Sequence, residues 1–193
     1  MNKITDKKRM KMSSILQAAR DEFLSFGYIA ANMDRISKAA KVTKQTVYRY
    51  FPSKAELFKS TLSYMGEHSH ISYYEYLDLN DTEEALEKFA LGFIKAHLTD
   101  EHIETYRLLL SECRNEPSIV SYFFEQGPDE TKNKLTGFFT NKLKIDTPST
   151  SINLWTAMLL SYRNRAMLNK DRPSKKTIEE HVKECNRWLL GSI

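Results

Sequence analysis

Helical periodicity runs through nearly the whole of this sequence, and the usual signals of β structure are missing from it. Alternating β-branched runs and Asn-Gly or Asp-Gly hairpin turns are absent, and only 6 Gly and 5 Pro interrupt the 193 residues. Apolar residues instead recur every three to four positions, a spacing that places them on one face of an α-helix. We therefore predict an all-α chain.

Helix-capping residues divide the first 60 residues into four expected helices. The first follows Ser13 or begins slightly earlier and ends at Gly27, with an apolar face of Ile15, Ala19, Phe23 and Phe26. Asn32 is expected to cap a short second helix, and Thr43 a short third helix after a tight turn. A Ser53–Glu56 capping box begins the fourth. A short helix, a tight turn and a second short helix after a longer one form a helix-turn-helix frame.

The remaining sequence predicts further helices after an aromatic, polar break at residues 68–79. Five helices are expected here. The first begins at Asn80, the second covers about residues 102–115, and the third covers 118–143 with an interruption at Gly127-Pro128. The fourth covers 148–168, and the fifth runs from Pro173-Ser174 to Gly191.

The charge is unevenly distributed along the chain. Residues 1–60 carry 13 Lys/Arg and 5 Asp/Glu, a net +8, whereas the remaining residues carry 16 and 20, a net −4. A basic first third on an acidic remainder is typical of a polyanion-binding head, although a solvated basic surface without a partner is the alternative.

Several classes of protein are not expected from this sequence. The two cysteines, Cys113 and Cys185, lie far apart, and no apolar run is long enough to span a bilayer. Without a signal segment, a zinc-spaced Cys/His cluster or a catalytic motif, we expect a cytoplasmic protein that is no enzyme and has no cofactor or metal. For the histidines, including His97, His102 and His181, surface or capping roles are favoured over metal binding.

The segment from Thr43 to Lys54 has the side chains of a DNA-reading helix. At its front, Lys44 can reach guanine or a phosphate, Gln45 can pair with adenine, and Thr46 can contact a phosphate or a thymine methyl group. The phosphate-holding groups expected behind them are Tyr48, Tyr50 and Lys54, and a basic N-terminal arm at Lys7-Lys8-Arg9 is expected to add phosphate or minor-groove contacts. Val47 and Phe51 should pack inward. The candidate DNA-binding residues are Asn32, Thr43, Lys44, Gln45, Thr46, Tyr48, Tyr50 and Lys54.

The two last long helices carry heptad-spaced apolar stripes that suit either a subunit interface or the core of a monomer. The residues that we expect at a homodimer interface are Ile152, Trp155, Leu159, Ile178, Val182, Cys185 and Leu189.

The motifs of the first 58 residues resemble the DNA-binding domain of the TetR/AcrR transcriptional regulators. The resemblance covers about residues 10–58 and rests on Phe26-Gly27-Tyr28, Met33 to Ile36, Val42-Thr43-Lys44, Tyr48-Arg49-Tyr50-Phe51 and Ser53-Lys54-Ala55-Glu56-Leu57-Phe58. A weaker likeness to ligand-sensing domains rests on Tyr106-Arg107-Leu108-Leu109, Glu112 and Pro117.

This resemblance implies a homodimer of about nine helices per subunit that binds a double-stranded DNA operator. It implies a three-helix helix-turn-helix DNA-binding domain at residues 1–58 and a larger effector-binding and dimerisation domain at 59–193. It further implies a repressor that a small molecule releases from a palindromic site. The alternatives are an effector-independent or partner-regulated DNA-binding protein of the same fold, and a helical interaction domain that has lost DNA binding.

Three positions depart from the family pattern. Ala31 and Asn32 stand where Thr-Thr is common, and Ala31 cannot bond a phosphate. Lys41 stands where a turn glycine is frequent, so either Lys41 adopts a strained positive φ or the turn differs from the family pattern. Gln45 replaces a small residue, which makes it the favoured specificity residue.

The large side chains of the second part of the chain suit a hydrophobic or aromatic effector, although plain core is the alternative for each of them. The candidate effector-pocket residues are Phe89, Phe93, His97, Tyr106, Leu109, Cys113, Phe123, Trp155, Met158 and Tyr162.

Overall fold

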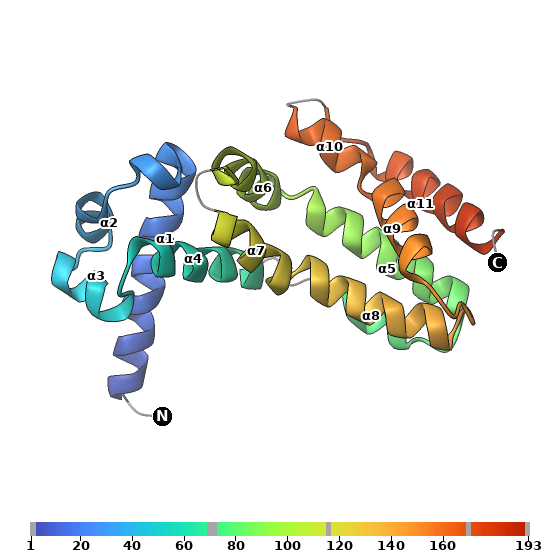
Figure 1. The fold of residues 1–193 in the computed structure, drawn as a ribbon, viewed down its shortest axis with the longest axis horizontal. Coiled ribbons are helices and arrows are strands. Elements are labelled where there is room, and N and C mark those ends of the chain that lie inside the picture. Colours follow the sequence, from blue (N-terminus) through green and yellow to red (C-terminus); the bar gives the residue numbers. More distant parts are fainter. Residues whose placement is uncertain (1–2, 69–72, 115–116, 169–170, 192–193) are drawn as a thin grey trace. The chain divides into compact units, whose positions relative to one another are not determined.

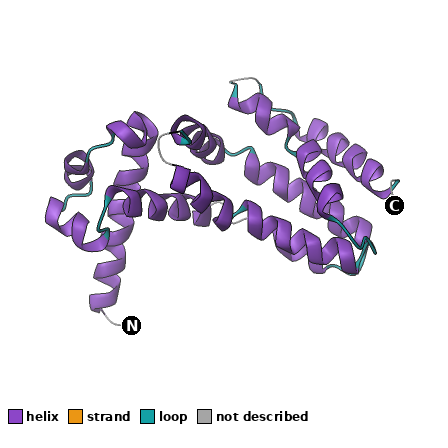
Figure 2. Cartoon of the chain, viewed as in Figure 1, coloured by secondary structure: helices purple, strands orange, loops and turns teal. Residues whose placement is uncertain are grey.

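The computed structural model describes residues 3–68, 73–114, 117–168 and 171–191, and these ranges form helices without any strand (Figure 2). They contain eleven α-helices and one 3-10 helix, η1, two α-helices more than the nine or so expected. None of the helices in these ranges is both long and apolar enough to cross a membrane. The elements are α1 Lys3–Ala30, α2 Met33–Ala39, α3 Lys44–Tyr50, α4 Lys54–His68, η1 Tyr73–Asp78, α5 Thr82–His97, α6 Asp100–Glu112, α7 Pro117–Gln126, α8 Pro128–Asn141, α9 Ser149–Leu159, α10 Ser161–Met167 and α11 Lys175–Leu190 (Figure 1).

The chain divides into two compact units. Unit 1 comprises residues 1–68 and 104–126, and unit 2 comprises residues 69–103 and 127–193. These units follow packing, so α4 and most of α6 and α7 are grouped with the first three helices. A functional division between residues 58 and 59 stays a prediction.

Unit 1 is built around an aromatic cluster. The Phe58 ring of α4 meets Phe23 edge-on at 4.6 Å and Tyr28 edge-on at 5.1 Å between ring centroids. Leu108, Leu109 and Ile119 of α6 and α7 belong to the same buried core. Burial of these side chains supplies the main stabilisation that holds the short helices α2 and α3 in place.

Unit 2 is built around α5. Phe89 stacks on Trp155 of α9 at 5.8 Å, and the Trp155 indole N–H donates to Asn186 Oδ1 of α11 at 3.0 Å. Gly92 lets η1 pack closely on α5, since a Cβ there would lie 2.6 Å from the Tyr73 Cβ. The indole bond satisfies the polar atom of the largest fully buried side chain in the described residues.

Three expectations about helix boundaries and faces need correction. Helix α1 begins at Lys3, about ten residues before the expected start, and its non-helical residue is Gly27, with φ of 74°. Phe26 is exposed rather than buried, and the Arg35 guanidinium lies 4.4 Å from its ring centroid. The helix expected over 148–168 is divided at Leu160 into α9 and α10, which accounts for one of the additional α-helices.

Candidate nucleic-acid interface

The α2–α3 frame is fixed by the caps that the sequence predicts. Asn32 Oδ1 accepts the Asp34 N–H at 2.7 Å, and Thr43 Oγ1 accepts the Thr46 N–H at 3.1 Å. Lys41 has φ of 55°, so of the two alternatives for this turn the structure contains the positive φ. Ser53 Oγ likewise accepts the Glu56 N–H and begins α4.

Helix α3 has one buried face and one exposed face. Val47 and Phe51 are buried in the core of unit 1, which confirms the inward direction predicted for them. Gln45 is exposed and 41% of the Tyr48 side chain is accessible, while Tyr50 is half-buried. The exposed face therefore carries side chains able to contact the base edges and phosphates of a DNA groove.

Two of the candidate reading residues already have partners within the protein. The Lys44 ammonium donates to Asp34 Oδ2 at 2.9 Å, and this hydrogen bond, with the charge of Asp34, raises the pKa of Lys44. The Thr46 hydroxyl lies 2.9 Å from the Thr43 hydroxyl. Both contacts are exposed to solvent, so DNA can replace them at little cost.

Lys54, which the sequence predicts to hold a phosphate, is bonded to backbone carbonyls in the structure. Its ammonium donates to the carbonyl oxygens of Ile29 at 2.9 Å and Ala31 at 3.2 Å, and lies 4.8 Å from the Tyr28 ring centroid. It therefore anchors the turn between α1 and α2.

Sequence reasoning missed three other residues, on α1, α2 and α6, whose side chains bond to this turn. Glu22 is buried and accepts hydrogen bonds from the Asn32 N–H at 2.8 Å and from Arg35 Nε at 2.8 Å. Burial alone would raise the pKa of Glu22, but the bonds from Arg35 and Asn32 outweigh it and leave this pKa lowered. Glu112 of α6 is also buried, and its Oε1 accepts the Tyr28 N–H at 3.1 Å. No local signal marks such contacts, because their partners are distant in sequence.

The basic N-terminal segment is helical. Lys7, Lys8 and Arg9 are exposed, but they lie in the first turns of α1 rather than on an extended arm. An extended arm could enter a minor groove, whereas a helix of these dimensions is suited to phosphate contacts along its side.

The ten candidate effector-pocket residues are divided between the two units. Tyr106, Leu109, Cys113 and Phe123 belong to unit 1, and the other six belong to unit 2. Of the latter, Phe89, Phe93 and Trp155 are buried core, and His97, Met158 and Tyr162 are half-buried. Cys113 is exposed. The ten residues therefore do not all belong to one unit, and a pocket formed by them stays a prediction.

Three of the five histidines are described with their side chains and lie in unit 2. The His97 ring Nδ1 is 2.7 Å from the Phe93 carbonyl, and burial lowers the pKa of His97 to about 4. The His102 ring meets His97 at 4.4 Å, and burial also lowers the pKa of His102. His181 is half-buried, not exposed as expected, and its Nε2 lies 2.8 Å from the Met158 carbonyl. The side chain of His68 and the whole of His70 lie outside the described residues. Within the described ranges, no group of three His, Cys, Asp or Glu residues is placed to hold a metal ion.

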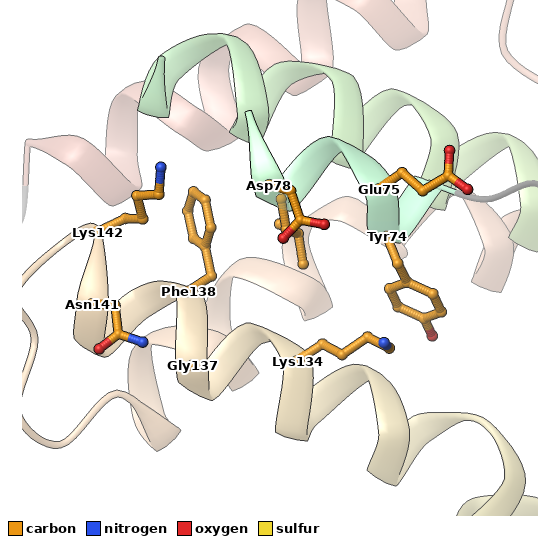
Figure 3. Close-up of a pocket in the computed structure, with 9 residues that line it drawn as sticks. Tyr74, Glu75, Asp78, Lys134, Gly137, Phe138, Asn141 and Lys142 are labelled. Carbon is orange, nitrogen blue, oxygen red and sulfur yellow. The ribbon is translucent and has the colours of Figure 1, made fainter. Parts of the chain in front are cut away.

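A groove of about 410 Å³ lies between η1 and α8 in unit 2 (Figure 3). Lys134 and Phe138 of α8, and Lys142 at its C-cap, face Tyr74 and Asp78 of η1 across it. None of the ten predicted pocket residues lines this groove, and its mixed charges fit no single class of effector.

The residues predicted for the dimer interface lie instead inside one subunit. All seven side chains, from Ile152 to Leu189, are buried within the single chain in the core of unit 2. The core of unit 2 accounts for the burial of these seven side chains, and a dimer interface formed by them stays a prediction. The exposed apolar side chains of these helices are others: Leu154 of α9 is 62% exposed and Trp188 of α11 is 69% exposed.

Two family models match the chain. The model for the tetR family of bacterial regulatory proteins matches residues 15–61, and the C-terminal domain model of AefR-like transcriptional repressors matches residues 84–191. Among curated proteins, the uncharacterized regulator YhgD of Bacillus subtilis is 50% identical over 44 residues, 23% of each chain. The transcriptional repressor SCO4008 of Streptomyces coelicolor is 44% identical over 48 residues, 25% of each chain. The matched stretch thus spans only about a quarter of the length of these curated relatives.

Solved structures match over nearly the whole chain. A protein of Mesorhizobium loti MAFF303099 assigned to the TetR family is 25% identical, with a TM-score of 0.82 over 94% of this chain and 96% of that one. The flavonoid-responsive regulator FrrA is 26% identical, with a TM-score of 0.79 over the same shares. Because the C-terminal model alone covers more than half of the residues, the chain belongs to the TetR family of transcriptional regulators, with an N-terminal helix-turn-helix DNA-binding domain and an AefR-like C-terminal domain.

Proposed function

We propose that this regulator is a repressor that binds a palindromic operator as a homodimer and is released by a small apolar or aromatic effector. The observation that carries the DNA-binding part is the two-faced helix α3. Buried Val47 and Phe51 fix its orientation, and Lys44, Gln45 and Tyr48 are left on the exposed face. This is the arrangement by which a recognition helix enters a major groove.

The exposed residues divide by chemistry into two groups. Lys44, Gln45 and Thr46, at the front of α3, are assigned to base edges, with the Gln45 amide suited to adenine. The residues assigned to the DNA backbone are Asn32, Thr43, Tyr48, Tyr50 and Lys54. An ammonium has three N–H donors, so Lys54 can keep both turn carbonyls and still donate to a phosphate.

For the homodimer, we assign the exposed apolar side chains of α9 and α11 to the interface. Leu154 and Trp188 are large and mostly accessible in the single chain, and α9 packs against α11 within unit 2. Exposed aromatic and aliphatic groups of this kind are enriched in buried subunit interfaces. A Trp188→Glu, Leu154→Glu double variant should shift the protein toward a monomer in analytical ultracentrifugation.

The repressor assignment and the effector class draw on the named relatives. The matched C-terminal model is described for AefR-like repressors, and SCO4008 is named a repressor. The activator FasR of Mycolicibacterium smegmatis is 40% identical over 52 residues, so a similar head can also serve activation. FrrA is named for its response to flavonoids, which favours an aromatic effector here.

Selection of bound sequences from random duplex DNA tests the operator part. We expect recovery of a palindrome whose half-sites lie about 34–36 Å apart or slightly more, bound less tightly as salt increases. Equal binding to selected and random duplex would defeat the proposal. Thermal-shift screening against flavonoids and other aromatic compounds, followed by release from the selected duplex, tests the effector part. A screen without a stabilising compound would favour the effector-independent alternative.

A further inference from the structure

The turn between α1 and α2 is bonded to charged side chains at five consecutive residues. The Tyr28 N–H donates to Glu112, the Ala30 carbonyl accepts from Arg35 at 2.9 Å, and the Asn32 N–H donates to Glu22. Lys54 holds the Ile29 and Ala31 carbonyls between them. Of the four charged residues, Glu112 alone comes from outside residues 1–58, and it lies within the stretch matched by the C-terminal family model.

The backbone at Gly27 leaves space for the Glu112 carboxylate. Gly27 has φ of 74°, a conformation that side chains other than glycine's rarely adopt, and it ends the regular part of α1. A Cβ at this position would lie 2.8 Å from Glu112 Oε1. Glycine is therefore required twice, for its conformation and for the close approach of the carboxylate.

Burial makes the Glu112–Tyr28 contact matter more than an exposed hydrogen bond would. The Glu112 side chain is 7% exposed, and its neighbours Leu108 and Leu109 pack in the core of unit 1. A buried N–H that loses its acceptor is costly, because water cannot replace the acceptor without opening the packing.

Only a short stretch of chain connects Tyr28 to α3. Asn32 caps α2 four residues after Tyr28, and α2 has only 7 residues. The Val42 N–H then donates to the Ser37 carbonyl at 3.0 Å in the turn that leads to α3. Helices this short follow their anchors, since they have little stability of their own.

We propose that Glu112 is a positioning residue of the DNA-reading head: by accepting the Tyr28 N–H, it fixes the turn from which α2 and α3 are placed. This inference rests on the proposed operator binding. It makes a residue of α6 part of the DNA-binding apparatus without any contact to DNA.

The test compares variants of the full-length protein on the duplex selected with the wild type. Glu112→Gln keeps a carbonyl oxygen that can accept the Tyr28 N–H, whereas Glu112→Leu has similar size and no acceptor. Glu104→Gln is the control, because Glu104 lies on the same helix but is exposed and paired with Arg107. We expect operator affinity to fall about tenfold for Glu112→Leu, which is the effect of one lost buried acceptor, and to change less than about twofold for the other two.

Amide hydrogen exchange separates positioning from general stability. In folded Glu112→Leu, we expect the Tyr28 amide to lose protection while amides of the α5 core in unit 2 keep theirs. Glu112→Asp retracts the carboxylate by one methylene and serves if Glu112→Leu does not fold. It should weaken operator binding by an intermediate factor.

The outcomes are distinguishable. Wild-type affinity in folded Glu112→Leu or Glu112→Asp would overturn the inference, as would equal losses in Glu112→Gln and Glu112→Leu. Failure of the wild type to select any duplex would instead defeat the proposed function, and the positioning role with it.

Discussion

The α1–α2 turn and the outer face of α3 belong to the same unit but are built in opposite ways. In the turn, backbone groups are bonded to side chains from four different helices, among them the buried carboxylates Glu22 and Glu112. On α3, the side chains assigned to DNA are exposed or half-buried, and Lys44 is held by the exposed Asp34.

The buried turn is therefore suited to supporting α2 and α3, and the exposed face of α3 is suited to contacting DNA. Buried hydrogen bonds to charged groups are strong and resist exchange, so the turn gives α2 and α3 a fixed origin. Exposed contacts are weakened by water and salt, so Lys44 and its neighbours can exchange protein partners for DNA. A rigid support beneath exposed, adaptable side chains is the arrangement expected of a site that must dock in one register.

The largest effect that the comparison predicts is at the packing under the turn. Phe58→Ala removes a fully buried ring that touches Phe23 and Tyr28, and should cost about 3–5 kcal/mol of unfolding free energy, as measured by urea denaturation. Tyr48→Ala removes an exposed aromatic ring from α3 and is the matched control, with an expected change within about 0.5 kcal/mol. Similar losses of unfolding free energy in the two variants would contradict the distinction between the buried support and the exposed face of α3.

The next effect depends on pH. The folded-state pKa of Glu22 lies below its ordinary value of 4.5, so Glu22 contributes stability above that value. The contribution is lost as pH falls through the lower folded-state pKa. Glu22→Gln should therefore reduce the melting temperature at pH 7 by about 3 °C, a modest figure because Arg35 is partly exposed and screened. The gap from the wild type should narrow toward pH 3, and a constant gap at all pH values would contradict the assignment.

The sequence predicted those parts of the head that depend on local chemistry. The caps at Asn32, Thr43 and Ser53 and the inward direction of Val47 follow from residue type and short spacing, and the structure contains them. Helical periodicity predicted the all-α class, and the family resemblance, confirmed by the matched models, supplied the TetR architecture.

Contacts between distant residues could not be predicted in the same way. Glu112 and Tyr28 are 84 positions apart, and Lys54 and Ile29 are 25 apart, so no periodicity connects them. The stripe from Ile178 to Leu189 is buried within the single chain, and its sequence pattern could not distinguish core from subunit interface, since both select buried apolar side chains. Exposure distinguishes them, and exposure is a property of the folded subunit.

On the exposed face of α3, replacing Gln45 should change the preference between DNA sequences. Gln45→Ala removes the only amide that we assign to a base edge, so the difference in binding free energy between the selected duplex and one altered at the contacted base pair should shrink by about 1–3 kcal/mol. Tyr48→Phe, which removes one hydroxyl assigned to phosphate, should weaken both duplexes alike. Competition binding at fixed salt measures both, and an unchanged preference in Gln45→Ala would remove Gln45 from base reading.

The smallest effect should come from Asp34, which competes with DNA for Lys44. Asp34→Asn releases the Lys44 ammonium and removes one negative charge beside the reading face, so affinity should rise a few-fold on every duplex, with about one more ion released in the salt dependence. Asp21→Asn, at an exposed carboxylate on α1, is the control for the change in net charge. If Asp34→Asn instead weakens binding to the selected duplex alone, then Asp34 aims Lys44 rather than restraining it. The outer face of α3 would then be preorganised by its own ion pair, and the contrast with the buried turn would be one of strength rather than of kind.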